Sequence, residues 1–290
     1  MFSDISPTAR GVILMVGAML TIPAVDGVAK YLTTEHSPLF VGWARYALAS
    51  LIVLPLSMLR HGRRVFPASR HGAHFLRTVF IVLSMAAYFL AIARIPLATA
   101  ATTALVGPIV AVILSVLVLK EQLTPRKLIS LALGVVGALI IVGLNSSADP
   151  GIFYALASGL FFGCYLVATR QARDADPIQT LAFQVSVGAL LLTPFAIWEW
   201  STPDLAGMLL LAGIALLGTV SHVMSISAFR FADASTLAPL VYVELLGVTL
   251  IGYVAFDEVP GWTTIIGAAL IVGGGVVLFP RRPVNPPTPL

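Results

Sequence analysis

Long apolar segments recur along the whole 290-residue chain, and each is long enough to cross a lipid bilayer as a helix. A helix needs about 20 residues to span about 30 Å of hydrocarbon. Lipid offers no partner to backbone N–H and C=O groups, so segments that cross it must be helical. The chain is therefore predicted to be an all-α integral membrane protein with ten transmembrane helices. Their approximate bounds are 11–32, 39–58, 72–93, 98–119, 126–144, 150–170, 177–198, 205–229, 235–256 and 262–279.

The composition supports a membrane protein and excludes several other classes. Hydrophobic residues make up 58% of the chain and charged residues 10%, against about 25% charged in an average soluble domain. The formal charge of +4 is spread over short loops, which argues against nucleic-acid binding. The single cysteine, Cys164, cannot form an internal disulfide, and the histidines do not cluster with acids at metal-ligand spacing. No metal and no cofactor is predicted.

Lysine and arginine lie mostly on one side of the predicted bundle. Only Lys30 and Arg94 are assigned to the other side, and Arg45 and Arg77 fall within predicted helices. The basic side is formed by the N-terminus, alternate loops and the C-terminus. It carries Arg10, Arg60, Arg63, Arg64, Arg70, Lys120, Arg126, Lys127, Arg170, Arg173, Arg230, Arg281 and Arg282. By the positive-inside rule both termini are expected in the cytoplasm of a bacterial-type inner membrane, which requires an even number of helices.

The two halves of the chain resemble each other at several positions with nearly constant offsets. The matched pairs are Gly11 and Gly151, Leu20 and Leu160, Lys30 and Arg170, Pro38 and Pro177, Pro55 and Pro194, Ala91 and Ala228, Thr99 and Thr236, Glu121 and Glu258, and Gly137 and Gly274. Each predicted repeat has five helices, and an odd number turns the second copy upside down in the membrane. Inverted repeats of this kind are the plan of many secondary transporters, with the solute bound near the midplane between them.

The repeated segments carry residues that resemble the EamA module of the drug/metabolite transporter superfamily. In the first copy these are the run Ala91-Ile92-Ala93-Arg94-Ile95-Pro96-Leu97-Ala98, then Pro108, Lys120-Glu121 and Gly137. In the second copy they are Ala228-Phe229-Arg230-Phe231, Pro239, Asp257-Glu258, Gly267 and Gly274, with the arginine displaced by one residue. The resemblance implies two inverted five-helix EamA repeats, at 11–144 and 150–279, followed by a cytoplasmic tail at 280–290. It also implies a ten-helix carrier, and export of a metabolite as the commoner direction.

Intramembrane ionisable residues are the main indication of a site, because a charge at the bilayer centre normally faces a cavity or a partner. Glu244 lies near the middle of the segment 235–256. It is predicted either to bind a cationic group or to take up a coupling proton, since burial favours the protonated carboxyl; the alternative is a structural hydrogen bond. His222 shares a helix face with the small residues Gly218, Ser221 and Ser225. This stripe is expected either to line the cavity or to form a tight helix contact.

A second group of charges lies towards the other side of the membrane. Asp26 and Lys30 are four residues apart and can pair on one helix face, and Arg45 is a further candidate partner for Asp26. These residues form either an ion-pair gate without solute contact or a site in which Arg45 or Lys30 holds a carboxylate. Together with Glu244, Arg45 would suit an amino acid or another zwitterion.

Further candidates come from prolines, aromatic residues and the repeat. Pro108 and Pro239 fall inside matching helices and are expected to act as hinges or static kinks beside the site. Gln184 matches Arg45 in the repeat and is predicted to face the cavity. The aromatic residues that could contact a solute are Trp43, Tyr88, Tyr165 and Tyr242. Glu121 and Glu258 end matching helices and are expected to fix loop geometry or to pair with lysine or arginine, without solute contact.

These observations favour a secondary carrier for a small organic metabolite that works by alternating access, with protons as a candidate coupling ion. An uptake carrier for a vitamin-like solute such as riboflavin is the alternative. A membrane enzyme is disfavoured because motifs such as G-x-S-x-G and H-E-x-x-H are missing. A channel is disfavoured because no filter-like loop is evident. The expected partners are the solute, the lipid bilayer and protons, and the sequence allows a monomer or a homodimer.

Both chain ends are predicted to lie on the same, cytoplasmic face. Single cysteines added near each end of a Cys164→Ala variant should react with a membrane-impermeant maleimide only when the reagent reaches the inner face. Reaction of the two ends from opposite faces would contradict an even number of helices and the inverted repeat.

Overall fold

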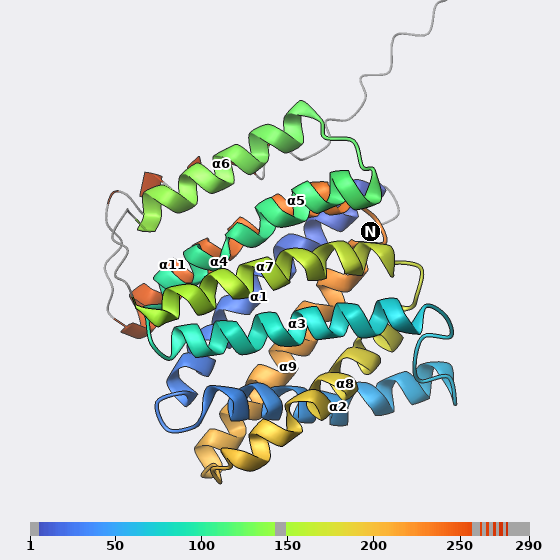
Figure 1. Ribbon diagram of the computed structural model, residues 1–290, viewed down its shortest axis with the longest axis vertical. Helices are drawn as coiled ribbons and strands as arrows, with labels where there is room; N and C mark the ends of the chain where they lie inside the picture. Colours follow the sequence, from blue (N-terminus) through green and yellow to red (C-terminus); the bar gives the residue numbers. More distant parts are fainter. Residues whose placement is uncertain are drawn as a thin grey trace, which may run out of the picture.

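The computed structural model describes residues 6–142, residues 149–256 and scattered positions between 262 and 277, and its helices lie side by side in one bundle (Figure 1). The described residues contain seven helices that are long and apolar enough to cross a membrane, and the shorter apolar helix Val106–Leu119. The helices are α1 (Pro7–Leu32), α2 (Pro38–His61), α3 (His71–Ile92), α4 (Leu97–Ala104), α5 (Val106–Leu119), α6 (Pro125–Val142), α7 (Pro150–Gln171), α8 (Pro177–Trp198), α9 (Leu205–Ala228), α10 (Ala234–Leu237), the 3-10 helix η1 (Ala238–Val243) and α11 (Glu244–Phe256).

The predicted all-helical membrane fold is confirmed over these residues, but the number of ten helices is not. Most of the tenth predicted segment, 262–279, lies outside the described residues, as do Glu258, Gly267 and the tail at 280–290. The number of helices and the boundaries of the two repeats therefore stay predictions.

Proline begins several helices, as the sequence indicates. Pro38, Pro125, Pro150 and Pro177 are the first residues of α2, α6, α7 and α8. The N–H of a residue at this position has no acceptor within the helix, so proline costs no hydrogen bond here by lacking one. Residues just before these prolines accept hydrogen bonds from the free N–H groups of the first turn, for example Asp176, whose Oδ1 accepts from the N–H of Ile178 at 2.8 Å.

Helices of the first half pack against helices of the second half in a reciprocal pattern. In the predicted repeat α1 corresponds to α7, α2 to α8, and α3 to α9. In the structure α3 packs against α7, α1 packs against α9, and α2 packs against α8. The first two contacts are exchanged by the repeat, and the third maps onto itself, as a two-fold relation between the halves requires. Figure 1 shows α2 and α8 together along one edge of the bundle and α6 along the opposite edge.

We call the end of the bundle that carries the loops 62–70, 120–124, 172–176 and 229–233 the basic end. Here the Glu121 carboxylate accepts hydrogen bonds from the N–H groups of Ala234 and Ser235 at the start of α10. The same carboxylate lies 3.4 Å from the Arg170 guanidinium, and Arg170 also pairs with Asp233. Glu121 therefore joins the end of α5 to α7 and α10, in agreement with its expected role in loop geometry.

Two segments that the sequence presents as continuous helices are broken in the structure. The segment 98–119 divides into α4 and α5 at Leu105, and the segment 235–256 passes through the 3-10 helix η1 before α11. Each break is close to a proline predicted as a hinge. Pro108 has no N–H to donate to the carbonyl of Ala104, the last residue of α4, so the helical hydrogen bond at this point is missing. Pro239 is the second residue of η1.

The two breaks meet at the centre of the bundle. The Tyr242 hydroxyl in η1 donates a hydrogen bond of 3.3 Å to the carbonyl of Leu105 between α4 and α5. The broken backbone of the first half also lies against Gly159 and Gly163 of α7. A Cβ at Gly163 would lie 2.7 Å from the carbonyl oxygen of Gly107, so these glycines allow irregular backbone to be buried in protein, where it is tolerated at membrane depth.

Gly159→Ala is expected to destabilise the protein, because its Cβ would overlap the carbonyl oxygen of Ala104. Overpacking of this kind typically costs about 1–3 kcal/mol. Thermal unfolding of the purified protein in detergent measures the loss. The matched control is Gly213→Ala, where a Cβ would have no neighbour within 4 Å; equal melting temperatures for the two variants would refute the close α4–α7 contact.

Candidate functional site

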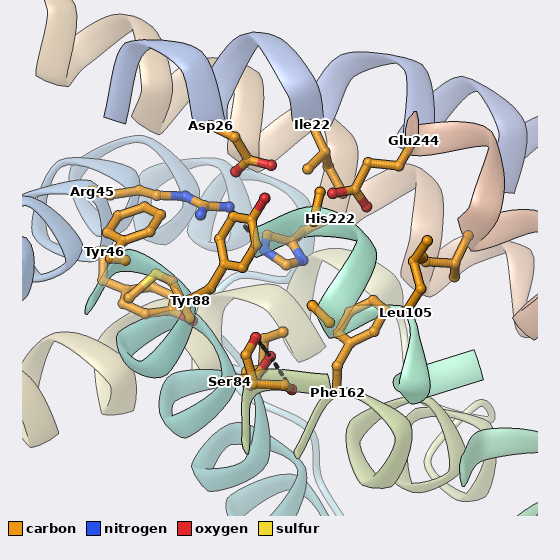
Figure 2. Close-up of a pocket in the computed structure, with 17 residues that line it drawn as sticks. Ile22, Asp26, Arg45, Tyr46, Ser84, Tyr88, Leu105, Phe162, His222 and Glu244 are labelled. Carbon is orange, nitrogen blue, oxygen red and sulfur yellow. Dashed lines mark hydrogen bonds between the residues drawn. The ribbon is translucent and has the colours of Figure 1, made fainter. Parts of the chain in front are cut away.

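A cavity of about 100 Å³ lies between the two halves, next to the broken helices. Helices from both halves supply its walls, with most polar groups coming from α1, α2, α3, α9 and α11 (Figure 2). Its lining residues are Ile22, Asp26, Arg45, Tyr46, Ile81, Ser84, Met85, Tyr88, Phe89, Ala101, Ala104, Leu105, Ser158, Phe162, His222, Val241 and Glu244. This position between repeats is where the sequence predicts a solute site.

Two carboxyl groups enter the cavity from the same side. Asp26 extends from the C-terminal third of α1, and Glu244 is the first residue of α11, directly after the 3-10 helix η1. The two groups are close enough to interact directly. Asp26 is buried at 4% exposure, and its Oδ2 atom has no hydrogen-bond partner among the described residues. Adjacent carboxyl groups away from water repel when both are charged, so a cation or a proton stabilises them.

One guanidinium group balances this pair. Arg45 reaches across from α2, and its Nη2 atom lies 3.2 Å from Nε2 of His222 on α9. The side chain crosses directly over Gly218, where a Cβ would lie 2.8 Å from the arginine Nε. Arg45 also interacts electrostatically with Asp26. A zwitterion would find both of its charged ends matched here, because an arginine fork and two carboxyl groups face one small volume.

Aromatic and hydroxyl groups form the remaining polar wall. The Tyr88 hydroxyl points towards Asp26 (Figure 2) and is buried without a hydrogen-bond partner among the described residues. Ser84, one turn earlier on α3, donates a 3.0 Å hydrogen bond to the carbonyl of Ser158 on α7. Phe162, one turn after Ser158, closes this side. Ring faces of this kind can stack on an aromatic or cationic solute.

The small-residue stripe on α9 has two edges with different neighbours. His222 lines the cavity, and Gly218 makes room for Arg45. Ser221 turns away and donates to the carbonyl of Ala18 on α1 at 3.1 Å, and Ser225 contacts the sulfur of Met15. One edge of the stripe thus faces the cavity, and the other edge packs against α1.

Several predicted site residues lie elsewhere. Lys30 donates a 3.1 Å hydrogen bond to the carbonyl of Ile95, at the end opposite the basic end, and not to Asp26. Trp43 donates to Thr193 Oγ1 at 3.1 Å, and its ring packs edge-on against Trp200. Tyr242 bonds Leu105 between the breaks. None of these three side chains is among the described residues that line the central cavity.

Tyr165 and Gln184 belong to a second buried cluster around Arg77 of α3. Arg77 Nη2 donates to Gln184 Oε1 at 2.7 Å and to the Tyr165 hydroxyl at 3.3 Å. The cluster lies between the cavity and the basic end. Sequence reasoning placed Arg77 within a helix but assigned it no role, although the rule that singled out Glu244 applies to it equally.

Other lining residues carry too little signal in the sequence. Tyr46, Ser84, Ser158 and Phe162 are of types that also fill ordinary helix contacts, and only the packing of α2, α3 and α7 turns them towards one cavity. Tyr46 directly follows Arg45, which is the one sequence signal that could have indicated it.

A protein-family model described as the EamA-like transporter family matches residues 9–143 and again residues 149–279. Two matches to one model confirm the internal repeat. A solved structure titled "Crystal structure of protein" is similar at a TM-score of 0.77 and 20% identity, covering 94% of this chain and 96% of that one. It supports the fold alone.

Curated relatives with similar sequences are transporters. An S-adenosylmethionine uptake transporter of Rickettsia prowazekii is 24% identical over 265 residues, which is 91% of this chain and 90% of the relative. A riboflavin transporter of Brucella anthropi is 25% identical over 279 residues, covering 91% of this chain and 96% of the relative.

Tyr88→Phe is expected to leave thermal stability unchanged or to raise it, because the lost hydroxyl is buried without a partner. Tyr242→Phe is the matched control. It removes the hydrogen bond to Leu105 and should lower stability by about 1 kcal/mol. A larger loss of melting temperature for Tyr88→Phe than for Tyr242→Phe would show that the Tyr88 hydroxyl has a structural role.

Proposed function

Because the chain belongs to the EamA-like transporter family, we propose that it is a secondary carrier for a zwitterionic metabolite of the amino-acid type that also bears a second positive charge, with S-adenosylmethionine as the leading candidate. The observation that carries the proposal is the charge pattern of the central cavity. Asp26 and Glu244 face Arg45 across it, and no described acid other than these two lines it.

The chemistry of the candidate solute fits this pattern. S-adenosylmethionine carries a carboxylate, an ammonium group and a sulfonium group. The Arg45 fork would hold the carboxylate, and Asp26 and Glu244 would each face a positive group. The adenine ring would have Tyr88 and Phe162 to stack on. The S-adenosylmethionine uptake transporter of Rickettsia prowazekii, similar over 91% of this chain, supports the same class of solute.

The size of the cavity supports alternating access. Its volume of about 100 Å³ is below the roughly 300 Å³ at which ligand pockets begin, so the halves would have to move apart before a solute of this class could bind. Solute enters when the halves separate at one end. The breaks at Leu105 and η1 lie beside the cavity, and backbone that already lacks helical hydrogen bonds there can change conformation at little further loss.

Protons are the proposed coupling ion. When the solute leaves, the repulsion between Asp26 and Glu244 returns, and uptake of a proton by the pair relieves it. Proton and cationic solute therefore compete for the same carboxyl groups, which gives exchange of one for the other. We place the basic end in the cytoplasm of a bacterial inner membrane, following the positive-inside rule. The family resemblance indicates export, whereas the S-adenosylmethionine relative is named for uptake.

Riboflavin is the competing solute, supported by the Brucella anthropi relative and by the aromatic wall. Its neutral ring system offers no partner for two carboxyl groups and a guanidinium, which would then be desolvated without compensation. The charged groups therefore favour the zwitterion.

Glu244→Gln and Arg45→Gln are each expected to lower S-adenosylmethionine counterflow in proteoliposomes at least about tenfold, since each removes a charged contact worth about 1.5–3 kcal/mol. The assay follows labelled solute exchanging against an internal unlabelled pool, with riboflavin and methionine measured in parallel. Glu244→Gln should also abolish the dependence of the rate on pH.

Glu35→Gln, on an exposed loop residue, is the control and should keep wild-type flux. Faster counterflow of riboflavin than of S-adenosylmethionine, or an unchanged rate and pH profile in Glu244→Gln, would rule out the proposed solute or the proposed coupling role.

A further inference from the structure

Polar side chains follow one face of α3 from the basic end of the bundle to the central cavity. His74, Arg77, Ser84 and Tyr88 are spaced by three, seven and four residues, so they lie in one line along the helix. Ser84 and Tyr88 line the central cavity, and His74 lines a hollow of about 360 Å³ at the basic end. Arg77 lies between these two spaces.

Arg77 is fully buried and bonded only to neutral groups among the described residues. Its side chain has 0% exposure. Its Nε donates to Thr169 Oγ1 at 3.0 Å, and its Nη2 donates to Gln184 Oε1 and to the Tyr165 hydroxyl. The guanidinium carbon also lies 5.1 Å from the centre of the Tyr165 ring. A buried positive charge without an anionic partner is costly in a membrane bundle.

Polar atoms without hydrogen-bond partners gather around this guanidinium. Arg77 Nη1, Gln184 Nε2, Thr180 Oγ1 and His74 Nδ1 are all buried and unpartnered among the described residues. Buried polar groups are normally paired. The first two atoms are donors that belong to side chains with 0% exposure, and Gln184 and Thr180 are one turn apart on α8. The cluster therefore offers more donors than acceptors and fits a planar anion.

A single layer of side chains separates this cluster from the central cavity. Tyr46 lines the cavity and interacts with Gln184. Its ring also packs over Gly188, one turn from Gln184 on α8, where a Cβ would lie 3.2 Å from the ring. Tyr46 therefore stands between the cavity and the cluster.

We propose that the polar seam between α3, α7 and α8 is the arm of the transport path that leads to the basic end, and that Arg77 within it is a second binding position for a carboxylate. The solute passes its carboxylate from Arg45 in the cavity to Arg77 as α3 and α8 separate. The Arg77–Gln184 hydrogen bond closes this arm in the present structure. This inference rests on the proposed carrier function for its solute, but the charge and accessibility of the seam do not depend on which solute is carried.

A role in holding helices together does not account for these observations. The hydrogen bonds to Thr169, Tyr165 and Gln184 use Nε and Nη2, whereas Nη1 is left without a partner among the described residues. An anion entering the seam would pair with Nη1 and balance the charge, to which the present structure offers the Tyr165 ring and neutral acceptors.

Cysteine labelling tests the seam directly. The chain has one cysteine, so Cys164→Ala gives a background in which Thr180→Cys is the only thiol. Inside-out membrane vesicles expose the basic end, which we place in the cytoplasm, to two methanethiosulfonate reagents of similar size, the anionic sulfonatoethyl and the cationic trimethylammonioethyl compound. The anionic reagent should react roughly tenfold faster, because a positive site raises the local concentration of anions. Addition of Arg77→Gln should remove this preference.

Ser186→Cys on the same helix is the matched control, since its side chain bonds the carbonyl of Ala182 and lies off the face that carries Thr180 and Gln184. It should react with neither reagent. Equal rates of the two reagents at Thr180→Cys, or no reaction there, would overturn the proposal.

A second measurement separates binding in the cavity from passage through the seam. Arg77→Gln should change the dissociation constant of S-adenosylmethionine less than about threefold, while counterflow falls at least tenfold; Arg77→Lys should restore part of the flux. Equal losses of binding and flux with a lowered melting temperature would overturn the proposal in favour of a structural role. If Thr180→Cys shows the anionic preference but S-adenosylmethionine neither binds nor moves, the seam stands and the proposed solute fails.

Discussion

Hydrocarbon cannot hydrogen-bond, and this constraint governs both the fold and the site. It makes every crossing segment a helix and brings broken backbone, where it occurs, into the centre of the protein. It also makes a buried polar atom without a partner informative, because the protein is the only source of partners. Among the described residues outside the central cavity, such atoms belong to His61 at the end of α2 and to the group around Arg77 between α3 and α8. The same constraint that shapes the bundle thus supports the proposed path for polar molecules.

The broken helices are the point at which fold and function meet. Pro108 and Pro239 interrupt equivalent segments of the two repeats, and the interruptions contact each other through Tyr242 and Leu105. Glu244 reaches the cavity because α11 begins at that residue, directly after η1. Gly159 and Gly163 on α7 allow the irregular backbone to pack closely. A site built on interrupted helices can be stable in each closed form and still change shape between them.

The repeat also clarifies the two intramembrane arginines. Arg45 on α2 reaches α9, and Arg77 on α3 reaches Gln184 on α8, which is the repeat equivalent of Arg45. Exchange of the halves relates the two helix pairs, α2 with α9 and α8 with α3, but not the individual contacts, because the residue that matches His222 at the offset of 137 is Met85. Arg45 faces two carboxyl groups, whereas the groups bonded to Arg77 are neutral. In the proposed mechanism, this difference in electrostatic surroundings would distinguish a site for a whole zwitterion from a site for its anionic end.

The sequence by itself determined the membrane class, the internal repeat and most helix starts, because hydropathy and proline chemistry act locally or at fixed spacing. The cost of buried charge also singled out Asp26, Arg45, His222 and Glu244, which line one cavity in the structure. Which side chains share a cavity was decided only by tertiary structure. Tyr165 and Gln184 join Arg77, Tyr242 bonds a neighbouring break, and Lys30 bonds Ile95. A polar residue in a helix can face any of several neighbouring helices, and only the packing of the bundle decides which one it contacts.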